Sequence, residues 1–531
     1  MCGIAGFSLP PNSSPSSEWF DFASQSLSHR GPDDKGFYEA LNGRMCLMHT
    51  RLSIVDLSDL GHQPMLSTDG RLAIVFNGEI YNYKEIKYEL ESLGYTFRGN
   101  SDTEVLLTFY QELLRISPSK PSQASLSAFL RGLNGIFAFS IWDSHLQSLL
   151  VVRDALGVKP LYLNHRHDGI YFSSEIKAFP ENNFTLDCSS IDSYLTHLWC
   201  AGVGTPALEI RKLGPGQACF ISHGEIDSMW NWYSLPAFRH NLISSQSNLS
   251  ETEAIQGVES HLRQAVERQL VADVPVGAFL SGGLDSSSIV SFAREINPDI
   301  CCFTIELNGA VSDGFSDDLP YARQVSSHLG VPLSVLSVDA SLMATSLEEM
   351  VWHLDEPLAD PASLNVLCIS RLARQQGIKV LLSGSGGDDI FSGYRRHYAL
   401  QSERLWSWLP RLLRVQLRQF TSSLPVSSSL FRRLRKAFSG AHLEGDARLV
   451  HYFRWSERSD LYALYTPSFR EALFQAQDED PMLAFLSDLP QDVSPLDRML
   501  ALEQRFFLTE HNLNYTDKMS MAVGVETRVP F

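Results

Sequence analysis

The chain has 531 residues, of which 44% are hydrophobic and 20% charged, and its formal net charge is -18. This length exceeds the ~250 to 300 residues over which a single core usually grows, so we expect two or more domains of an ordinary globular protein. The acidic balance excludes a general nucleic-acid binder, and the lack of any apolar run of roughly 18 residues argues against a membrane span.

The amino terminus has neither the basic lead nor the long apolar core of a secretory signal. The eight cysteines are scattered along the chain, with no CxxC pair among them. This pattern predicts reduced thiols, a cytoplasmic location and no zinc site.

Short β-rich runs bounded by Gly, Asp or Asn dominate residues 1–235. The runs are 2–9, 46–56, 72–82, 136–143, 148–154 and 170–176. Helical spacing of apolar residues occurs mainly at 83–94 and 102–114. We therefore predict a first domain at 1–235 with a layered α+β fold built on antiparallel sheets.

Cys2 becomes the amino-terminal residue if Met1 is removed, and its small side chain favours that processing. A free α-amine has a pKa of about 7.7 to 8.0, so part of it is neutral at physiological pH and accepts a proton from the neighbouring thiol. The thiolate is a nucleophile, and an amino-terminal amine can act as its activating base. A cysteine at position 2 means little alone, so its role depends on the motifs that follow.

Four motifs follow in order: "HRGPDDKG" at 29–36, "RLSIVD" at 51–56, "FNGEIYN" at 76–82 and "NSDTEV" at 100–105. Each is weak by itself, because such sequences are common in turns and loops. Together with "CGIAGF" after Met1, they resemble the class II glutamine amidotransferases, an N-terminal-nucleophile family that releases ammonia from glutamine. The resemblance covers most of the first half of the chain.

This resemblance implies that Cys2 attacks the glutamine amide carbon and that a γ-glutamyl thioester forms. The Asn77 side chain and the Gly78 amide are the implied oxyanion hole, where each donor contributes on the order of 3 kcal/mol. The residues implied in glutamine binding are Arg51, Ile54, Asn77, Glu79 and Asp102. Among them, Arg51 and Asp102 meet the carboxylate and the amine of glutamine, Glu79 lies on the amine side, and Ile54 marks a backbone contact.

A polar stretch at 236–252 predicts a linker. In the second domain, 253–531, strands, loops and helices alternate, which is typical of a doubly wound parallel sheet. The segment "FLSGGLDSSSI" at 279–289 follows a short apolar run and opens a helix. Its glycines let backbone amides approach a phosphate, and its serines can donate hydrogen bonds at the helix N-terminus. The GxxxxGK[ST] pattern of a Walker A loop is absent.

The "SGGLDSS" loop resembles the PP-loop of ATP pyrophosphatases, which transfer AMP to an acceptor. The asparagine synthetase family joins a class II glutaminase to such a domain, and its second loop reads roughly SG-acid-G-small-D-acid-x-F-x-G-Y. Residues 383–394, "SGSGGDDIFSGY", match that loop except at the third place. The family pattern is also visible at 353–364 and 517–531, so the resemblance covers essentially the whole chain.

The family resemblance implies an ATP-dependent carbon-nitrogen ligase that uses ATP and Mg²⁺. The implied ATP contacts are Leu280, Ser281, Gly282, Gly283, Asp285, Ser286, Ile305, Ser383 and Gly384. Asp285 and Asp388 are the implied Mg²⁺ ligands, and the ion offsets charge on the pyrophosphate leaving group. A carboxylate acceptor forms an acyl-adenylate, and ammonia then displaces AMP. Because ammonium is no nucleophile, we expect a dry, apolar passage between the two sites.

Ser385 departs from the family pattern, because it replaces an acid linked to acyl-adenylate formation. A serine hydroxyl can position a substrate but is a poor general base at neutral pH. Asparagine synthetases amidate aspartate, whereas relatives in surface-polysaccharide pathways amidate uronic acids. Aspartate is the default acceptor, and Ser385 keeps a uronic acid as the alternative.

The family also continues past "RVPF" with an acid and a helical tail. We therefore expect either that the chain is a fragment of a longer protein or that its synthetase site is incomplete. A homodimer would fit the family.

Residues 395–438 carry nine arginines and one lysine against a single acid, Glu403, within a predicted helical insertion over about 395–500. Solvated surface helices are one explanation of this charge. A contact with an anionic partner or a peripheral contact with a membrane surface is the other.

Two alternative functions stay open at this stage, a non-catalytic regulator that keeps the fold and a glutaminase that acts alone. The retention of Cys2, Asn77, Asp102, Asp285 and Asp388 opposes the first. The expected partners are small molecules: glutamine, ATP and a carboxylate acceptor.

Overall fold

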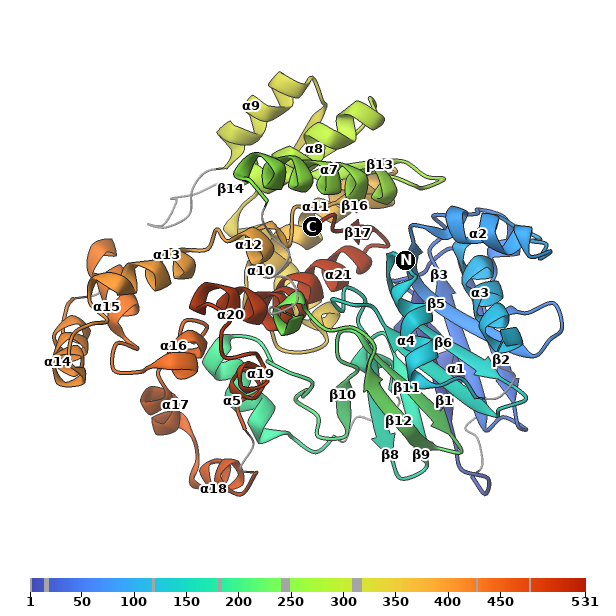
Figure 1. The fold of residues 1–531 in the computed structure, drawn as a ribbon, viewed down its shortest axis with the longest axis horizontal. Helices are drawn as coiled ribbons and strands as arrows, with labels where there is room; N and C mark the ends of the chain where they lie inside the picture. The colour runs from blue at the N-terminus through green and yellow to red at the C-terminus, as the bar shows by residue number, and fades with distance from the viewer. Residues whose placement is uncertain are drawn as a thin grey trace.

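The computed structural model describes residues 2–13, 19–116, 120–179, 184–239, 249–307, 318–425, 428–476 and 479–531. We call residues 2–239 the N-terminal half and residues 249–531 the C-terminal half. The paired sheets of the N-terminal half lie at one side of the molecule, and the helices of the C-terminal half extend to the other (Figure 1).

Two six-stranded antiparallel sheets form the centre of the N-terminal half. Their strand orders are β10-β8-β9-β1-β3-β2 and β12-β11-β7-β6-β5-β4. The first contains β1 Gly3–Ser8, β2 Asp34–Ala40, β3 Met45–Arg51, β8 Tyr162–Arg166, β9 Gly169–Ser173 and β10 Ile210–Lys212. The second contains β4 Met65–Leu66, β5 Leu72–Ile80, β6 Gly135–Asp143, β7 Ser148–Arg153, β11 Gln217–Ser222 and β12 Glu225–Asn231. Each of the six β-rich runs in the sequence overlaps one of these strands, and no strand begins more than one residue before its run.

Alternation along β5 explains how the layers stack. Ala73 and Val75 point into the core between the two sheets, whereas Ile74 and Phe76 belong to the core beneath the helices. Those helices are α2 Tyr83–Ser92, α3 Asp102–Ile116 and α4 Gln123–Arg131, and α1 Trp19–Ser26 packs on the outer face of the first sheet. The predicted layered α+β fold is confirmed.

The C-terminal half contains a five-stranded parallel sheet in the order β15-β14-β13-β16-β17. Its strands are β13 Val276–Phe279, β14 Cys301–Leu307, β15 Leu333–Val338, β16 Val380–Leu382 and β17 Glu526–Arg528. Chain order reverses between β13 and β16, which are neighbours. In open α/β sheets, ligands bind beyond the carboxyl ends of the strands at such a switch point.

Helices cover both faces of this sheet. The core on one side includes residues of α7 Glu251–Gln269, α8 Leu284–Ile296 and α9 Leu319–Leu329, and the core on the other includes residues of α11 Ala362–Gln375. The predicted doubly wound fold is thus confirmed. The predicted linker, 236–252, contains the short helix η3 Pro236–Arg239 and the start of α7, and its residues 240–248 lie outside the described residues.

The remainder of the C-terminal half is helical. It contains α10 Ala340–Leu354, α12 Gly387–Phe391, α13 Arg395–Ser402, α14 Arg411–Ser422, α15 Ser429–Phe438, α16 Gly445–His451, α17 Arg458–Leu464, α18 Pro467–Ala476, α19 Pro481–Ser487, α20 Pro495–Leu502, the π-helix η5 Glu503–Leu513 and α21 Asn514–Met521. In the described part of the chain, no helix has the length and apolar character needed to cross a membrane.

The basic residues of 395–438 fall into two groups. Arg396 and Arg414 turn inward and pair with Glu503 and Glu444. Others, including Arg404, Arg411 and Arg433, are exposed. Contact with an anionic partner or membrane stays a prediction, and the exposed group is the part of the segment available for it.

Candidate functional site

A small pocket at the edge of the N-terminal half gathers the residues implied in glutamine chemistry. Its walls include Cys2 before β1, Arg51 at the end of β3, Glu79 in β5 and Asp102 at the start of α3. The complete lining is Cys2, Arg51, Leu52, Ile54, Val55, Gly61, Gln63, Phe76, Gly78, Glu79, Ser101, Asp102 and Thr103. We call this the nucleophile pocket. Cys2, Arg51, Glu79 and Asp102 come from four separate sequence motifs.

Asn77 contacts Cys2 directly, although its side chain does not line the pocket. The Cys2 backbone N–H donates to Asn77 Oδ1 at 3.0 Å. The other amide atom, Nδ2, is buried and has no hydrogen-bond partner among the described residues. A buried donor beside the nucleophile suits the stabilisation of an oxyanion. Burial raises the pKa of the Cys2 thiol, so a base is needed to form the thiolate.

Gly78 lies where β5 meets β6 at close range. A Cβ atom at this position would collide with the carbonyl oxygen of Ile136. The site therefore requires glycine, and this close approach keeps the Gly78 backbone in the pocket wall.

Three charged groups lie in this pocket at fixed places. The Arg51 guanidinium donates to the backbone carbonyls of Asp56 and Ser58. Asp102 Oδ2 accepts the Ile80 N–H at 2.9 Å, and burial raises the pKa of Asp102 to about 6. Burial also raises the pKa of Glu79, and Glu526 adds to this effect. The pocket thus combines a cation with two carboxylates, as the zwitterionic end of an amino acid requires.

Two pocket features were not expected from sequence. Gln63 lines the wall and accepts the Phe76 N–H through Oε1 at 2.7 Å. The Ile54 carbonyl, near the predicted backbone contact, accepts the N–H of Asp273 from the C-terminal half at 2.9 Å. Gln63 lies in an irregular segment whose sequence has no helical or strand period, so no pattern pointed to it. The contact between Ile54 and Asp273 depends on how the two halves pack.

The two predicted ATP loops meet at the switch point of the parallel sheet. Residues 280–283 join β13 to α8, and residues 383–386 follow β16. Gly384 lies so near α8 that a Cβ there would be 2.9 Å from the Ser286 nitrogen, and a Cβ at Gly387 would collide with the Asp285 carboxylate. The two glycines allow this approach.

Hydroxyl groups organise the first loop. Ser281 Oγ and Ser286 Oγ are 3.0 Å apart, and the Gly283 N–H donates to Ser281 Oγ at 3.3 Å. Gly282 has φ +79°, and a Cβ there would collide with the Ala322 backbone nitrogen of α9. The loop therefore needs glycine for both conformation and space.

Not every implied ATP residue presents its side chain to this site. The Leu280 side chain is buried in the core, and its N–H donates to the Phe303 carbonyl at 2.9 Å. Ile305 lies in β14, next to β13. Leu284, which follows the loop residue Gly283 at the start of α8, has instead an exposed side chain, with 82% of its surface accessible.

Asp285 and Asp388 are the candidate metal ligands. Burial raises the pKa of both carboxyl groups, and the charge of Asp388 raises that of Asp285 further. In the described residues no group of three or more His, Cys, Asp or Glu side chains could hold a metal ion. A pair of carboxylates fits Mg²⁺, because this ion commonly takes one or two carboxylates and completes its shell with phosphate and water.

Ser385 lies beside Ser383 rather than in the core. The two hydroxyls are 3.0 Å apart, and the Ser385 N–H donates to Ser383 Oγ at 3.2 Å. Ser385 also lines a cavity of ≈ 510 Å³ between the halves, which we call the central cavity. Its other walls include the apolar residues Ile136, Leu156, Val158, Leu508, Leu513 and Val529, and also Tyr81, two positions after Glu79 in the chain. The cavity is thus lined by residues of both halves, among them Tyr81 and the second-loop residue Ser385.

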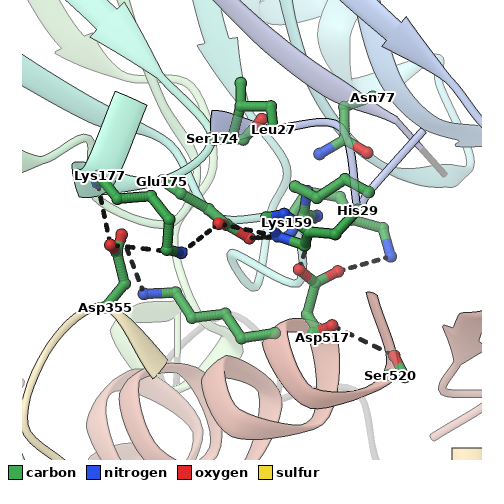
Figure 2. A network of polar contacts seen from close by, with 12 residues as sticks. Leu27, His29, Asn77, Lys159, Ser174, Glu175, Lys177, Asp355, Asp517 and Ser520 are labelled. Atoms are coloured by element: carbon green, nitrogen blue, oxygen red, sulfur yellow. Dashed lines mark hydrogen bonds and ion pairs between the residues drawn. The ribbon is translucent and has the colours of Figure 1, made fainter. Parts of the chain in front are cut away.

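Buried ion pairs join the halves beside the nucleophile pocket (Figure 2). Arg30 Nη2 pairs with Asp517 of α21 at 2.8 Å, and Lys159 Nζ lies 3.4 Å from the other oxygen of Asp517. Lys177 contacts both Glu175 and Asp355. The motifs at 353–364 and 517–531 therefore supply charged residues to the contact between the halves.

Comparisons with known proteins agree with this arrangement. Residues 1–233 match the glutamine amidotransferase domain, and residues 257–531 match the asparagine synthase family. Asparagine synthetase [glutamine-hydrolyzing] 1 of Bacillus subtilis is 31% identical over 541 residues, with 100% of this chain and 79% of that protein covered. Amidase chry2 of Gibberella zeae is 27% identical over 579 residues, with 100% of this chain and 81% of that protein covered.

Sequence motifs, fold and relatives thus agree over both halves. Glutamine chemistry belongs to the first and ATP chemistry to the second. The chain belongs to the asparagine synthase family and is an ATP-dependent ligase of the glutamine-hydrolysing, asparagine synthetase type.

Proposed function

We propose that the protein hydrolyses glutamine at Cys2 and uses the ammonia to amidate an ATP-activated carboxylate, with aspartate as the default acceptor. The observation that carries this proposal is the central cavity, whose walls include Tyr81 beside the nucleophile pocket and Ser385 in the second ATP loop. We also propose residues 1–235 and 253–531 as the two functional domains. A glutaminase acting alone would have no use for a cavity lined by both halves.

Glutamine hydrolysis begins with the thiolate of Cys2. Removal of Met1 would leave the Cys2 α-amine at the position of the present N–H, 3.0 Å from Asn77 Oδ1, where it can accept the thiol proton. Sulfur then bonds to the amide carbon, and the carbon-nitrogen bond breaks as ammonia leaves with a proton. Asn77 Nδ2 and the Gly78 N–H stabilise the oxyanion, and water releases glutamate from the thioester.

Acceptor activation takes place at the switch point. The 280–286 and 383–386 loops bind ATP, and an acceptor carboxylate oxygen bonds to the α-phosphorus as the bond to pyrophosphate breaks. Asp285 and Asp388 would hold Mg²⁺, which supplies charge compensation at the pyrophosphate when bound. Ammonia then attacks the acyl carbon, and AMP departs. Apolar wall residues of the central cavity, such as Ile136 and Leu508, would limit the contact of ammonia with water on its way.

The identity of the carboxylate acceptor is the most specific part of the proposal. Ser385 supports the alternative, a uronic acid, because the family's acid at this place is replaced by a neutral hydroxyl. An acceptor screen decides between them by scoring glutamine-dependent AMP release with aspartate and with nucleotide-linked uronic acids. Aspartate alone supporting AMP formation confirms the default. Release with a uronic acid alone overturns it, and glutamate formation without AMP in every case supports a glutaminase only.

A further inference from the structure

Arg528 is a residue of the C-terminal half that reaches the nucleophile pocket. It ends β17, the edge strand of the parallel sheet, where it pairs in register with Leu382 of β16. Its Nη2 atom forms an ion pair with Glu79 Oε1 at 3.3 Å. Glu79 lines the pocket that holds Cys2, so a side chain of the synthetase half contacts a wall of the glutaminase site.

The Arg528 guanidinium is fully buried and held from several sides. Nη1 donates to the backbone carbonyls of Gln269 and Val271, each at 2.7 Å, and Nε donates to Glu526. These contacts leave the head group little rotational freedom. The position of Nη2 beside Glu79 is therefore fixed by the C-terminal half.

Arg528 also contacts the second ATP loop through its backbone. The Ser383 N–H donates to the Arg528 carbonyl at 2.8 Å. Ser383 is one of the residues implied in ATP binding. One residue thus touches the loop of one candidate site with its backbone and a wall of the other with its side chain.

Arg528 is the cation that lies beside the buried Glu79 carboxyl group. Burial and the nearby Glu526 carboxylate raise the pKa of Glu79, and Arg528 opposes both effects. The ion pair also orients the Glu79 carboxyl group in the wall of the nucleophile pocket. Within the described residues, Arg528 is the side chain that forms an ion pair with Glu79.

We propose that Arg528 is a positioning residue for glutamine hydrolysis, which holds the Glu79 carboxyl group in the pocket wall where the amine of the substrate binds. This inference rests on the proposed function. It makes glutamine binding dependent on β17, and hence on the correct folding of the ATP loop at Ser383. Its signature is a change in KM for glutamine with a smaller change in kcat, because Arg528 acts on binding and does not touch the reacting atoms.

The test compares Arg528→Met, Arg528→Lys, Glu79→Gln and the double variant Arg528→Met/Glu79→Gln in the full chain. We expect Arg528→Met to raise KM for glutamine roughly 10- to 100-fold, since hydrogen bonds and pairs to charged groups have that weight. Arg528→Lys should lie between wild type and Arg528→Met. In the Glu79→Gln background, Arg528→Met should raise KM little further, because the two residues act through one contact.

Lys379→Met is the matched control. It removes another ion pair between the halves, Lys379 with Asp33 at 2.8 Å, and neither residue lines the nucleophile pocket. Ammonia-dependent AMP release with an excess of acceptor reports whether the synthetase half of each variant is folded. Arg528→Lys serves if Arg528→Met does not fold.

The outcomes separate two failures. A wild-type chain without glutaminase activity contradicts the proposed function itself. An active wild type whose KM is the same in Arg528→Lys, or an Arg528→Met effect of equal size with and without Glu79, overturns the role of Arg528.

Discussion

Replacing Asp517 by asparagine removes one charge from the contact between the halves and little volume. Asp517 is buried, and it faces Arg30 at 2.8 Å and Lys159 at 3.4 Å, both of which are fully buried. Burial lowers the pKa of Arg30, yet Asp517 and Glu175 raise it by more, so the guanidinium stays charged. The variant therefore leaves two buried cations with Glu175 as the remaining acid at Arg30.

Breaking a buried ion pair by removing one partner costs about 3 to 5 kcal/mol. Unfolding entropy of about 2.1 cal/mol/K per residue makes each kcal/mol worth roughly 1 °C in Tm for a chain of this size unfolding as one unit. We expect Asp517→Asn to lower Tm by about 3 to 5 °C in a thermal melt followed by fluorescence. Lys379→Met removes a partly exposed pair, which is typically worth about 0 to 1 kcal/mol, and should shift Tm by about 1 °C or less.

The comparison of the two variants tests the reasoning. Equal shifts in Asp517→Asn and Lys379→Met would mean that burial does not amplify the Asp517 pair. A double variant with Lys159→Met should recover part of the loss, because one of the stranded cations is then gone. If the double variant melts below Asp517→Asn by the full cost of a second lost pair, the assigned network is wrong.

Four further predictions concern the two sites and the charges between them. Cys2→Ala should abolish glutamate release but keep ammonia-dependent AMP release within about twofold, and loss of both would place Cys2 in the fold rather than in the chemistry. Gly78→Ala should abolish glutaminase activity, since its methyl would collide with Ile136, and an active variant contradicts the close approach. Chelation with EDTA should stop AMP release while glutamate release continues, and AMP release without Mg²⁺ contradicts the assigned metal pair. Burial would raise the pKa of Glu356, but Lys212 and Lys518 lower it to about 2. The Glu356 carboxylate therefore contributes about 3 kcal/mol of folding stability above its unfolded pKa near 4.5, and this stability is lost as pH falls toward 2. Urea melts of wild type and Glu356→Gln should converge across that window.

Much of the fold was readable from local pattern. β5 is a clear case, because a run of largely apolar residues around Asn77 predicted a strand. All nine residues of that strand are buried, and alternate side chains belong to two different cores. The glycines at 282 and 283 were predicted to let the backbone approach a phosphate, and at Gly282 a Cβ would indeed collide with the backbone of α9. Such signals are local, because conformation and packing at one position restrict the residue found there.

Contacts between the halves carried no comparable signal. Arg528 lies 449 positions from Glu79 in the sequence, and no periodicity in β17, a three-residue strand, points to that partner. The π-helix η5 also has no distinct sequence period, although its Leu508 and Leu513 line the central cavity. These features depend on how the two halves pack against each other, and the order of residues along the chain gives no local pattern that specifies this packing.

The charged character of this contact has a physical consequence. An apolar interface would tolerate small slips, because the hydrophobic effect is not directional. A slip that separated Arg30 from Asp517, or Lys212 from Glu356, would instead leave buried charge unpaired at a cost of several kcal/mol. The ion pairs therefore favour one docking position, and in that position Tyr81 and Ser385 line the same cavity. Buried charge thus selects how the two candidate sites are aligned.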